Sequence, residues 1–218
     1  MSSYGDIQKE TLIVCALPIE TQNQLEDYDV LYTGVGKVNA TLKLARKFGK
    51  LGSYIPYNLV INYGTAGSQH RRYNKGDLVD CTRFVQRDMD VSGLGFKLGQ
   101  TPFEEDVPII IQSESEFNPI GKRVLCGSGD SFVTIDQFNW KNLVDVVDME
   151  AYAYAKFCKL YKISFCSDSS LYFFSSSFFS ISNWFFCKLR FWILFFKSGL
   201  VRSKFFNSSK ARLSFFSF

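Results

Sequence analysis

Short apolar runs alternate with segments of helical periodicity along the first 163 residues. Runs of this length are typical of buried or extended strands, and they occur at residues 12–17, 30–33, 59–63, 77–85, 108–112, 124–126 and 143–147. Apolar residues at helical spacing predict helices over residues 38–48 and 151–161. This alternation predicts an α/β fold with three layers, α/β/α, around a mixed, largely parallel sheet.

The pattern changes at Ser164. Phe and Ser supply 15 residues each of the last 55, and their apolar positions follow neither a helical nor a strand period. The uncharged stretch 171–187 is long enough for a membrane span, but its serines and the following Lys188 and Arg190 disfavour one. Phe, Ser, Leu, Cys, Tyr and Trp share codons that begin with uracil, so a uracil-rich message read out of frame or through an intron would give this composition. We therefore expect a truncated domain at 1–163 and an aberrant or non-native tail at 164–218, with a membrane anchor and a real packed element as the alternatives.

Charge and cysteine content narrow the function classes. The formal net charge of +4 is the sum of +6 in the tail and −2 in residues 1–163. The domain therefore has no basic patch that would suggest a nucleic-acid partner. Six scattered cysteines form no CxxC pair and there is a single histidine, so we expect no metal site. The polar start of the chain gives no sign of a secretory leader, and we expect a reducing, cytoplasmic location.

Five segments carry candidate chemistry. A carboxylate, Glu150, follows the strand at 143–147, where open α/β sheets bind ligands, and it could accept hydrogen bonds from two ribose hydroxyls. Glu20 follows the first strand in Ala16-Leu17-Pro18-Ile19-Glu20. Two glycine-rich turns, Thr33 to Ala40 and Asn62 to Ser68, could expose backbone N–H groups. Each has a plain structural alternative: a helix-start acid, tight turns or, for Phe132 in Ser128-Gly129-Asp130-Ser131-Phe132-Val133, a core aromatic.

In their order along the chain, these segments resemble the purine nucleoside phosphorylase/uridine phosphorylase superfamily. Within it, they are most similar to the 5′-methylthioadenosine/S-adenosylhomocysteine nucleosidases over about residues 11–163. Gly76-Asp77-Leu78-Val79 fits the same order, and the segment from Asp90 to Gln100 resembles the family's loop near the base and the subunit interface. The resemblance implies a nucleoside phosphorylase-like fold, a purine nucleoside as small-molecule substrate, no cofactor and a homodimer.

The resemblance also implies a role for individual residues. Glu20 matches the glutamate that activates the attacking water, and Glu150 matches the carboxylate that grips the ribose hydroxyls. The remaining matches are to substrate-binding positions. Val35 matches an apolar residue near the 5′ substituent, and Thr65, Ala66 and Gly67 match the turn that runs past the sugar and base. Phe132 matches the aromatic residue that stacks on adenine, Val133 the residue whose backbone contacts the base edge, and Met149 the residue under the ribose.

One group that the resemblance implies is missing. Relatives place a general-acid Asp after a further buried strand, and the register puts it at or near Phe173. Asp168 comes too early, and no apolar strand separates it from Ile163, so we expect the C-terminal strand and helix of the fold to be absent. The chain would then be unstable, inactive or both.

Three functions stay open. The first is a nucleosidase, because Glu20 replaces the phosphate-binding Arg that phosphorylases of the superfamily carry in this loop, and a carboxylate repels phosphate. The second is a phosphorylase, for which Arg71 and Arg72 are available. The third is an inactive or binding-only nucleoside-binding protein.

Overall fold

The computed structural model describes residues 10–21, 24–25, 27–52, 54–70, 72–113, 120–133 and 143–172, with no side-chain detail for residues 170–172. These residues lie within one compact unit, Met1–Phe174. Its elements follow the order β1 (Thr11–Cys15), α2 (Pro18–Thr21), β2 (Asp29–Tyr32), α3 (Lys37–Gly49), β3 (Leu59–Ser68), β4 (Leu78–Gln86), η1 (Ser92–Leu94), β5 (Ile110–Gln112), β6 (Arg123–Ser128), β7 (Val146–Asp148), α4 (Ala151–Tyr161) and β8 (Ser164–Tyr172).

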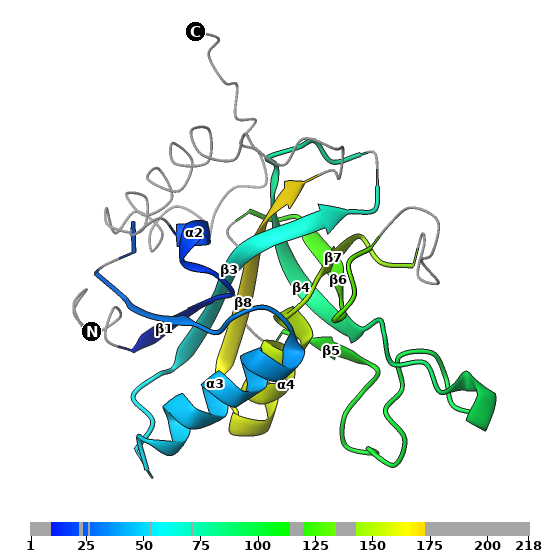
Figure 1. Ribbon diagram of the computed structural model, residues 1–218, viewed down its shortest axis with the longest axis horizontal. Helices are drawn as coiled ribbons and strands as arrows, with labels where there is room; N and C mark the ends of the chain where they lie inside the picture. Colours follow the sequence, from blue (N-terminus) through cyan, green and yellow to red (C-terminus); the bar gives the residue numbers. More distant parts are fainter. Residues whose placement is uncertain are drawn as a thin grey trace, which may run out of the picture. The chain divides into compact units, whose positions relative to one another are not determined.

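The strands form two parallel groups that meet edge to edge (Figure 1). In the first group β1 pairs parallel with β2 and β3, and β3 pairs parallel with β8. In the second group β6 pairs parallel with β4 and β7, and β5 adds an antiparallel edge to β4. Antiparallel pairs join the groups, β8 to β4 and the last two residues of β3 to β7. The mixed, mainly parallel sheet predicted from the sequence is confirmed.

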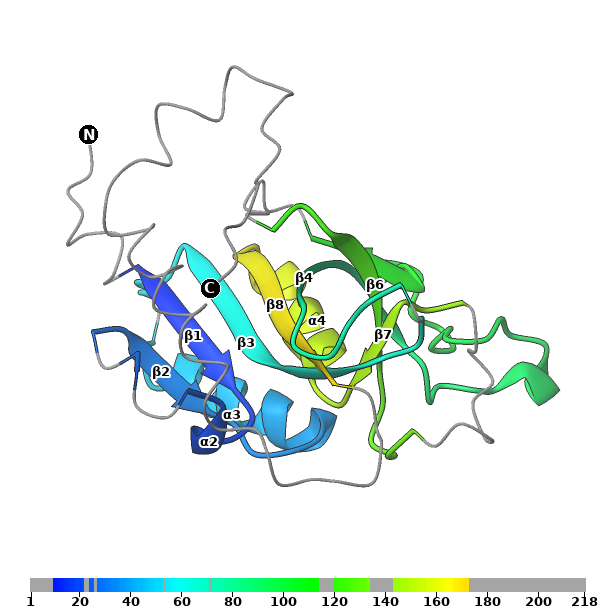
Figure 2. The same cartoon turned by 90° about the horizontal axis from the view of Figure 1, so that it is seen from above.

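The pairings close a ring through β3, β8, β4, β6, β7 and back to β3. Figure 2 shows β8 between β3 and β4, where it joins the two groups. Helices α3 and α4 pack against each other, and α4 lies on β4, β6 and β8. Apolar side chains of α3, α4 and the inner strands form one continuous core, which includes Leu12, Leu44, Phe84, Tyr154 and Phe165.

The expectation that no strand follows Ile163 is wrong. β8 continues the chain for nine residues, and it pairs with β3 at every position from Ser164↔Leu59 to Tyr172↔Gly67. The sequence does not show β8 as an apolar run, because two of its buried residues are serines whose hydroxyls have hydrogen-bond partners in the sheet. Asn62 donates its side-chain N–H to Oγ of Ser167 at 3.0 Å, and Ser167 and Ser169 are both buried.

Element boundaries differ from the expected ones mainly where glycine or polar residues extend a strand. β3 runs through Gly64 to Ser68 rather than ending at Tyr63, because its backbone pairs with both β8 and β7. β7 begins at Val146 instead of Leu143. Cys15, Cys126 and Cys158, which lie in apolar runs of the sequence, are buried free cysteines. The expected absence of the family's final helix and the rest of the expected aberrant tail concern residues after Tyr172, which lie outside the described residues.

Candidate active site

Glu20 lies in α2, immediately beyond the carboxyl end of β1. Its Oε2 accepts a hydrogen bond from the N–H of Leu17 at 3.0 Å, and its Oε1 accepts one from the Thr65 hydroxyl at 3.3 Å. These contacts hold the carboxylate over β3, where a Cβ added to Gly64 would lie only 3.2 Å from Oε1. Burial raises the pKa of Glu20, and the hydrogen bonds from Leu17 and Thr65 oppose that rise.

Glu150 lies in the bend between β7 and α4. Its Oε1 accepts a hydrogen bond from the main-chain N–H of Gly36 at 2.6 Å. Burial, followed by the charge of Asp148, raises the pKa of Glu150 to about 8; the Gly36 hydrogen bond opposes the rise, and the charges of Glu20 and Asp130 add to it. Four acidic groups from three segments therefore share one electrostatic environment.

Asp148 is a member of this group that sequence reasoning missed. Its Oδ2 accepts hydrogen bonds from the N–H groups of Glu150 at 3.2 Å and Ala151 at 2.7 Å, and its Oδ1 accepts one from the Ser128 hydroxyl at 2.5 Å. It thereby caps the start of α4 and joins that helix to the end of β6. An acid just ahead of a predicted helix is the sequence signal that could have identified it.

The turn between β2 and α3 supplies the N–H group that meets Glu150. Gly36 has φ 94°, a conformation that L side chains rarely adopt, and a Cβ there would lie 3.1 Å from Oδ1 of Asp130. Val35, just before it, is 42% exposed, and its carbonyl accepts a hydrogen bond from the Asn39 side chain at 2.7 Å. Val35 is therefore a partly exposed apolar residue in the turn whose Gly36 N–H meets Glu150.

The turn after β6 carries the two predicted base-binding residues. Phe132 is 57% exposed, so it is not the core aromatic of the alternative interpretation, whereas Val133 packs against the apolar cluster that includes Leu125 and Val147. Arg87 anchors this turn: its guanidinium donates to the Gly129 carbonyl at 3.0 Å and to the Ser131 hydroxyl at 3.1 Å. Sequence reasoning gave Arg87 no role, and no motif marks it.

The remaining predicted substrate-binding residues fall beside these. Gly67 of β3 pairs with Val147 of β7, which brings the Thr65 to Gly67 segment next to the residues that precede Glu150. Thr65 is exposed, Ala66 is buried and Met149 is partly buried. The structure therefore brings together the carboxyl ends of β1, β3, β6 and β7 and the turn after β2.

Asp168 does not join this group. It lies within β8, level with Tyr63 of β3 and Asp80 of β4, and is 3% exposed. It lies four positions before Tyr172, the last residue of the strand, and so about 13 Å short of the carboxyl end. Burial and the charge of Asp80 raise the pKa of Asp168 well above its usual value.

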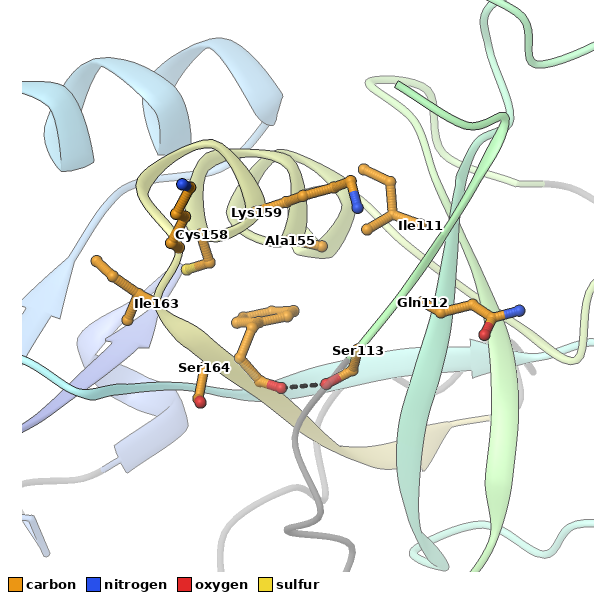
Figure 3. Close-up of a pocket in the computed structure, with 10 residues that line it drawn as sticks. Ile111, Gln112, Ser113, Ala155, Cys158, Lys159, Ile163 and Ser164 are labelled. Carbon is orange, nitrogen blue, oxygen red and sulfur yellow. Dashed lines mark hydrogen bonds between the residues drawn. The ribbon is translucent and has the colours of Figure 1, made fainter. Parts of the chain in front are cut away.

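A separate cavity of about 440 Å³ lies at the other end of α4 (Figure 3). Its lining comes from the carboxyl end of α4, the start of β8 and β5, and the Ser113 hydroxyl bonds the Phe165 carbonyl across it. Neither Glu20 nor Glu150 contributes to it. The cavity is therefore distinct from the acidic group described above.

The described residues contain neither a membrane-spanning helix nor a metal-binding cluster. No helix among them is both long and apolar enough to cross a bilayer. Within the same ranges, no cluster of three or more His, Cys, Asp or Glu side chains has the arrangement that a metal ion requires.

Comparison with known proteins identifies the family. Residues 26–171, which end in β8, match the Phosphorylase superfamily. The chain is 32% identical over 175 residues to the 5′-methylthioadenosine/S-adenosylhomocysteine nucleosidase of Bacillus thuringiensis, with 72% of each chain covered.

Solved structures show the same fold at lower identity. A Helicobacter pylori 5′-methylthioadenosine nucleosidase mutant with 5′-methylthioadenosine in its active site superposes with a TM-score of 0.64 at 22% identity, covering 75% of this chain and 84% of that one. The futalosine hydrolase of the same organism gives a TM-score of 0.64 at 21% identity, with 75% and 84% covered. From the match over residues 26–171 and the similarity to the Bacillus enzyme, this chain belongs to the phosphorylase superfamily.

Proposed function

We propose that this protein hydrolyses the N-glycosidic bond of purine nucleosides such as 5′-methylthioadenosine or S-adenosylhomocysteine. The observation that supports this most directly is the convergence of Glu20 and Glu150, two carboxyl groups from separate strand ends whose charges act on each other. The similarity to a 5′-methylthioadenosine/S-adenosylhomocysteine nucleosidase supports the same proposal.

The two carboxylates, Glu20 and Glu150, suit the positive charge that develops on the ribose in this reaction. Cleaving the bond builds positive oxocarbenium character on the ribose, which nearby carboxylates stabilise. Glu150 would accept hydrogen bonds from the ribose hydroxyls, which become more acidic in the transition state, and so binds that state more tightly. Glu20, held by Leu17 and Thr65, would orient a water on the face opposite the leaving base.

The other site residues would hold the base and the 5′ group. The exposed ring of Phe132 offers a face on which adenine can stack, and the Val133 backbone lies beside it. Val35 offers apolar contact to the 5′ substituent, and Met149 to the ribose. None of these contacts needs a metal or an organic cofactor.

Water is the better-supported nucleophile. Glu20 is the acidic group nearest the Thr65 turn, and its charge opposes phosphate binding there. Arg72, which sequence reasoning kept as a phosphate ligand, instead donates to Asp145 and lies over the Tyr73 ring. Arg71 lies outside the described residues.

Nucleoside binding without turnover is the second candidate, and the position of Asp168 favours it. The acid that would protonate the leaving base belongs at the carboxyl end of β8, where the chain continues into Phe173. Asp168 lies about four residues earlier and beside Asp80. A chain with Glu150 and Phe132 but no such acid would bind the nucleoside and cleave it slowly or not at all.

Adenine release from 5′-methylthioadenosine by the purified 218-residue chain tests these candidates, with and without phosphate. Release in phosphate-free buffer that Glu150→Gln abolishes supports the nucleosidase. A strict phosphate requirement would support the phosphorylase instead. Calorimetric binding of the nucleoside with no release would favour the binding-only protein. Glu104→Gln is a matched control, because Glu104 forms an ion pair with Lys156 on the outer part of α4.

A further inference from the structure

A cluster of three charged residues connects the start of α3 with the segments that follow β4 and β6. The Nζ of Lys37, at the start of α3, lies 2.5 Å from Oδ2 of Asp88 and 3.2 Å from Oδ2 of Asp130. Asp88 follows β4 and Asp130 follows β6, so the cluster connects three segments that are far apart in the sequence. Only 13% of the Lys37 side chain is exposed, compared with 28% for Asp88 and 44% for Asp130.

Main-chain hydrogen bonds reinforce the same connection. The N–H of Lys37 donates to Oδ1 of Asp130 at 2.8 Å, and the N–H of Asp130 donates to Oδ2 of Asp88 at 2.9 Å. Each carboxylate therefore binds both the ammonium group and a backbone amide of the neighbouring loop. Several bonds among partly buried groups form a network, and such a network fixes geometry better than a single exposed ion pair does.

The cluster adjoins the donor that meets Glu150. Gly36, which donates to Glu150, is the residue before Lys37, so the Lys37–Asp130 bond restrains the peptide unit next to the one that carries the Gly36 N–H. Asp130 belongs to the same turn as Phe132 and Val133. The position of the turn predicted to bind the base is thus tied to the position of the carboxylate predicted to bind the ribose.

The charge of Lys37 matters as well as its bonds. Asp130 is one of the charges that disfavour the ionised form of Glu150. The Lys37 ammonium lies between Asp88 and Asp130 and compensates part of their negative charge. Removing it would leave Arg87 to compensate Asp88 and Asp130, and more of the negative charge of Asp130 would act on Glu150.

We propose that Lys37, with Asp88 and Asp130, is a positioning residue that holds the base-binding turn and the Gly36 N–H in register with Glu150. This rests on the proposed function for its kinetic consequence, but the connection between the two loops is independent of any reaction. Lys37 itself contacts no predicted substrate position.

Lys37→Met tests the proposal, with Lys47→Met as its matched control. Lys47 lies near the other end of α3 and pairs with Asp29 at 2.6 Å, so the control removes a comparable ion pair from the same helix. Amide hydrogen exchange is the first measurement, because it requires no activity. We expect faster exchange at residues 34–37 and 128–132 in Lys37→Met, and not in Lys47→Met. Unchanged exchange in both segments would overturn the proposal, as would an equal change in the control.

Steady-state kinetics is the second measurement if the wild-type chain turns over substrate. We expect KM to rise roughly tenfold in Lys37→Met with a smaller fall in kcat, because the base-binding turn loosens. Lys37→Arg, which keeps the charge, should recover most of the loss. Asp88→Asn serves as a second variant if Lys37→Met fails to fold, and it should accelerate exchange in the same two segments. Wild-type inactivity would refute the proposed function, and the exchange result would still decide the positioning role.

Discussion

The main-chain N–H of Gly36 donates a hydrogen bond to Oε1 of Glu150 at 2.6 Å, although 114 residues separate the two in the sequence. This bond joins the turn after β2 to the end of β7, which belong to different parallel groups of the sheet. It places a backbone donor on a carboxyl group whose pKa is raised by burial and by the charge of Asp148.

Glu150 should control the acidic limb of the pH profile. Burial and the charge of Asp148 raise the pKa of its carboxyl group to about 8, and only the ionised form accepts two ribose hydroxyls through both of its oxygens. We therefore expect kcat/KM to rise with pH up to about 8 and then to level off. Glu150→Gln should lower kcat/KM by about 10²-fold or more and remove this limb. A profile already flat from pH 5 would contradict the assignment.

Asp148→Asn should move that limb to lower pH. Asp148 is the largest electrostatic cause of the raised pKa of Glu150 after burial, so removing its charge makes Glu150 easier to ionise. The amide oxygen can still accept one N–H at the start of α4, so we expect a loss of stability of only about 1 kcal/mol. Kinetics across pH 5–9 and urea unfolding measure the two effects. A limb that stays in place in this variant would show that Asp148 has no influence on Glu150.

Gly36→Ala should weaken both the fold and the site. An alanine at φ 94° is strained by about 1–2 kcal/mol, and its Cβ would crowd Asp130. Gly49→Ala is the control, because Gly49 ends α3 with nothing within 4 Å of an added Cβ. Thermal unfolding of both variants, together with nucleoside affinity, checks the prediction. Equal melting temperatures for the two variants would be evidence against it.

Asp168→Asn should stabilise the protein at neutral and alkaline pH. Oδ2 of Asp168 is buried without a hydrogen-bond partner, and its neighbour Asp80 is another carboxyl group. The raised pKa means that the folded state binds a proton more tightly than the unfolded chain, so stability falls as pH rises above the unfolded value. Asparagine carries no charge and can donate to Asp80. We expect a melting temperature higher by roughly 2–4 °C at pH 8, corresponding to about 1 kcal/mol, and little difference at pH 4.

Leu94→Glu should disrupt a homodimer, which we expect from the family resemblance of the loop from Asp90 to Gln100. Leu94 lies in η1 and is 76% exposed, so the substitution leaves the fold of one subunit intact. Tyr54→Glu is the control, because Tyr54 is 75% exposed and lies before β3. Sedimentation velocity should give a dimer for the wild type and the control and a monomer for Leu94→Glu. A wild-type monomer would refute the expectation.

The sequence predicted local features well where side-chain patterns carry them. The apolar runs of β1, β2 and β3 and the helical spacing of α3 and α4 identified those elements, because burial on one or both faces leaves a periodic trace. β8 left no such trace, since its serines are buried through hydrogen bonds to neighbouring strands rather than through apolar contact.

The candidate site also contains residues that the sequence predicted and residues that only the structure identified. Glu20 and Glu150 were predicted because each follows a strand and fits a family pattern, and their presence at strand ends is a property of the sequence. The roles of Asp148, Arg87 and Lys37 depend on partners from distant segments, namely Ser128, Gly129 and Asp88. No local pattern encodes those partners.

The sequence by itself determined the α/β class, most strand positions and the carboxylates at strand ends, because these follow from residue type and short-range spacing. Only the tertiary structure decided that β8 closes a ring between β3 and β4, and that the carboxyl ends of the two parallel groups meet around Glu150. It also placed Asp168 beside Asp80 instead of at the strand end. The reason is physical: strand pairing and electrostatic coupling depend on distances in space, and residues far apart in the chain set them.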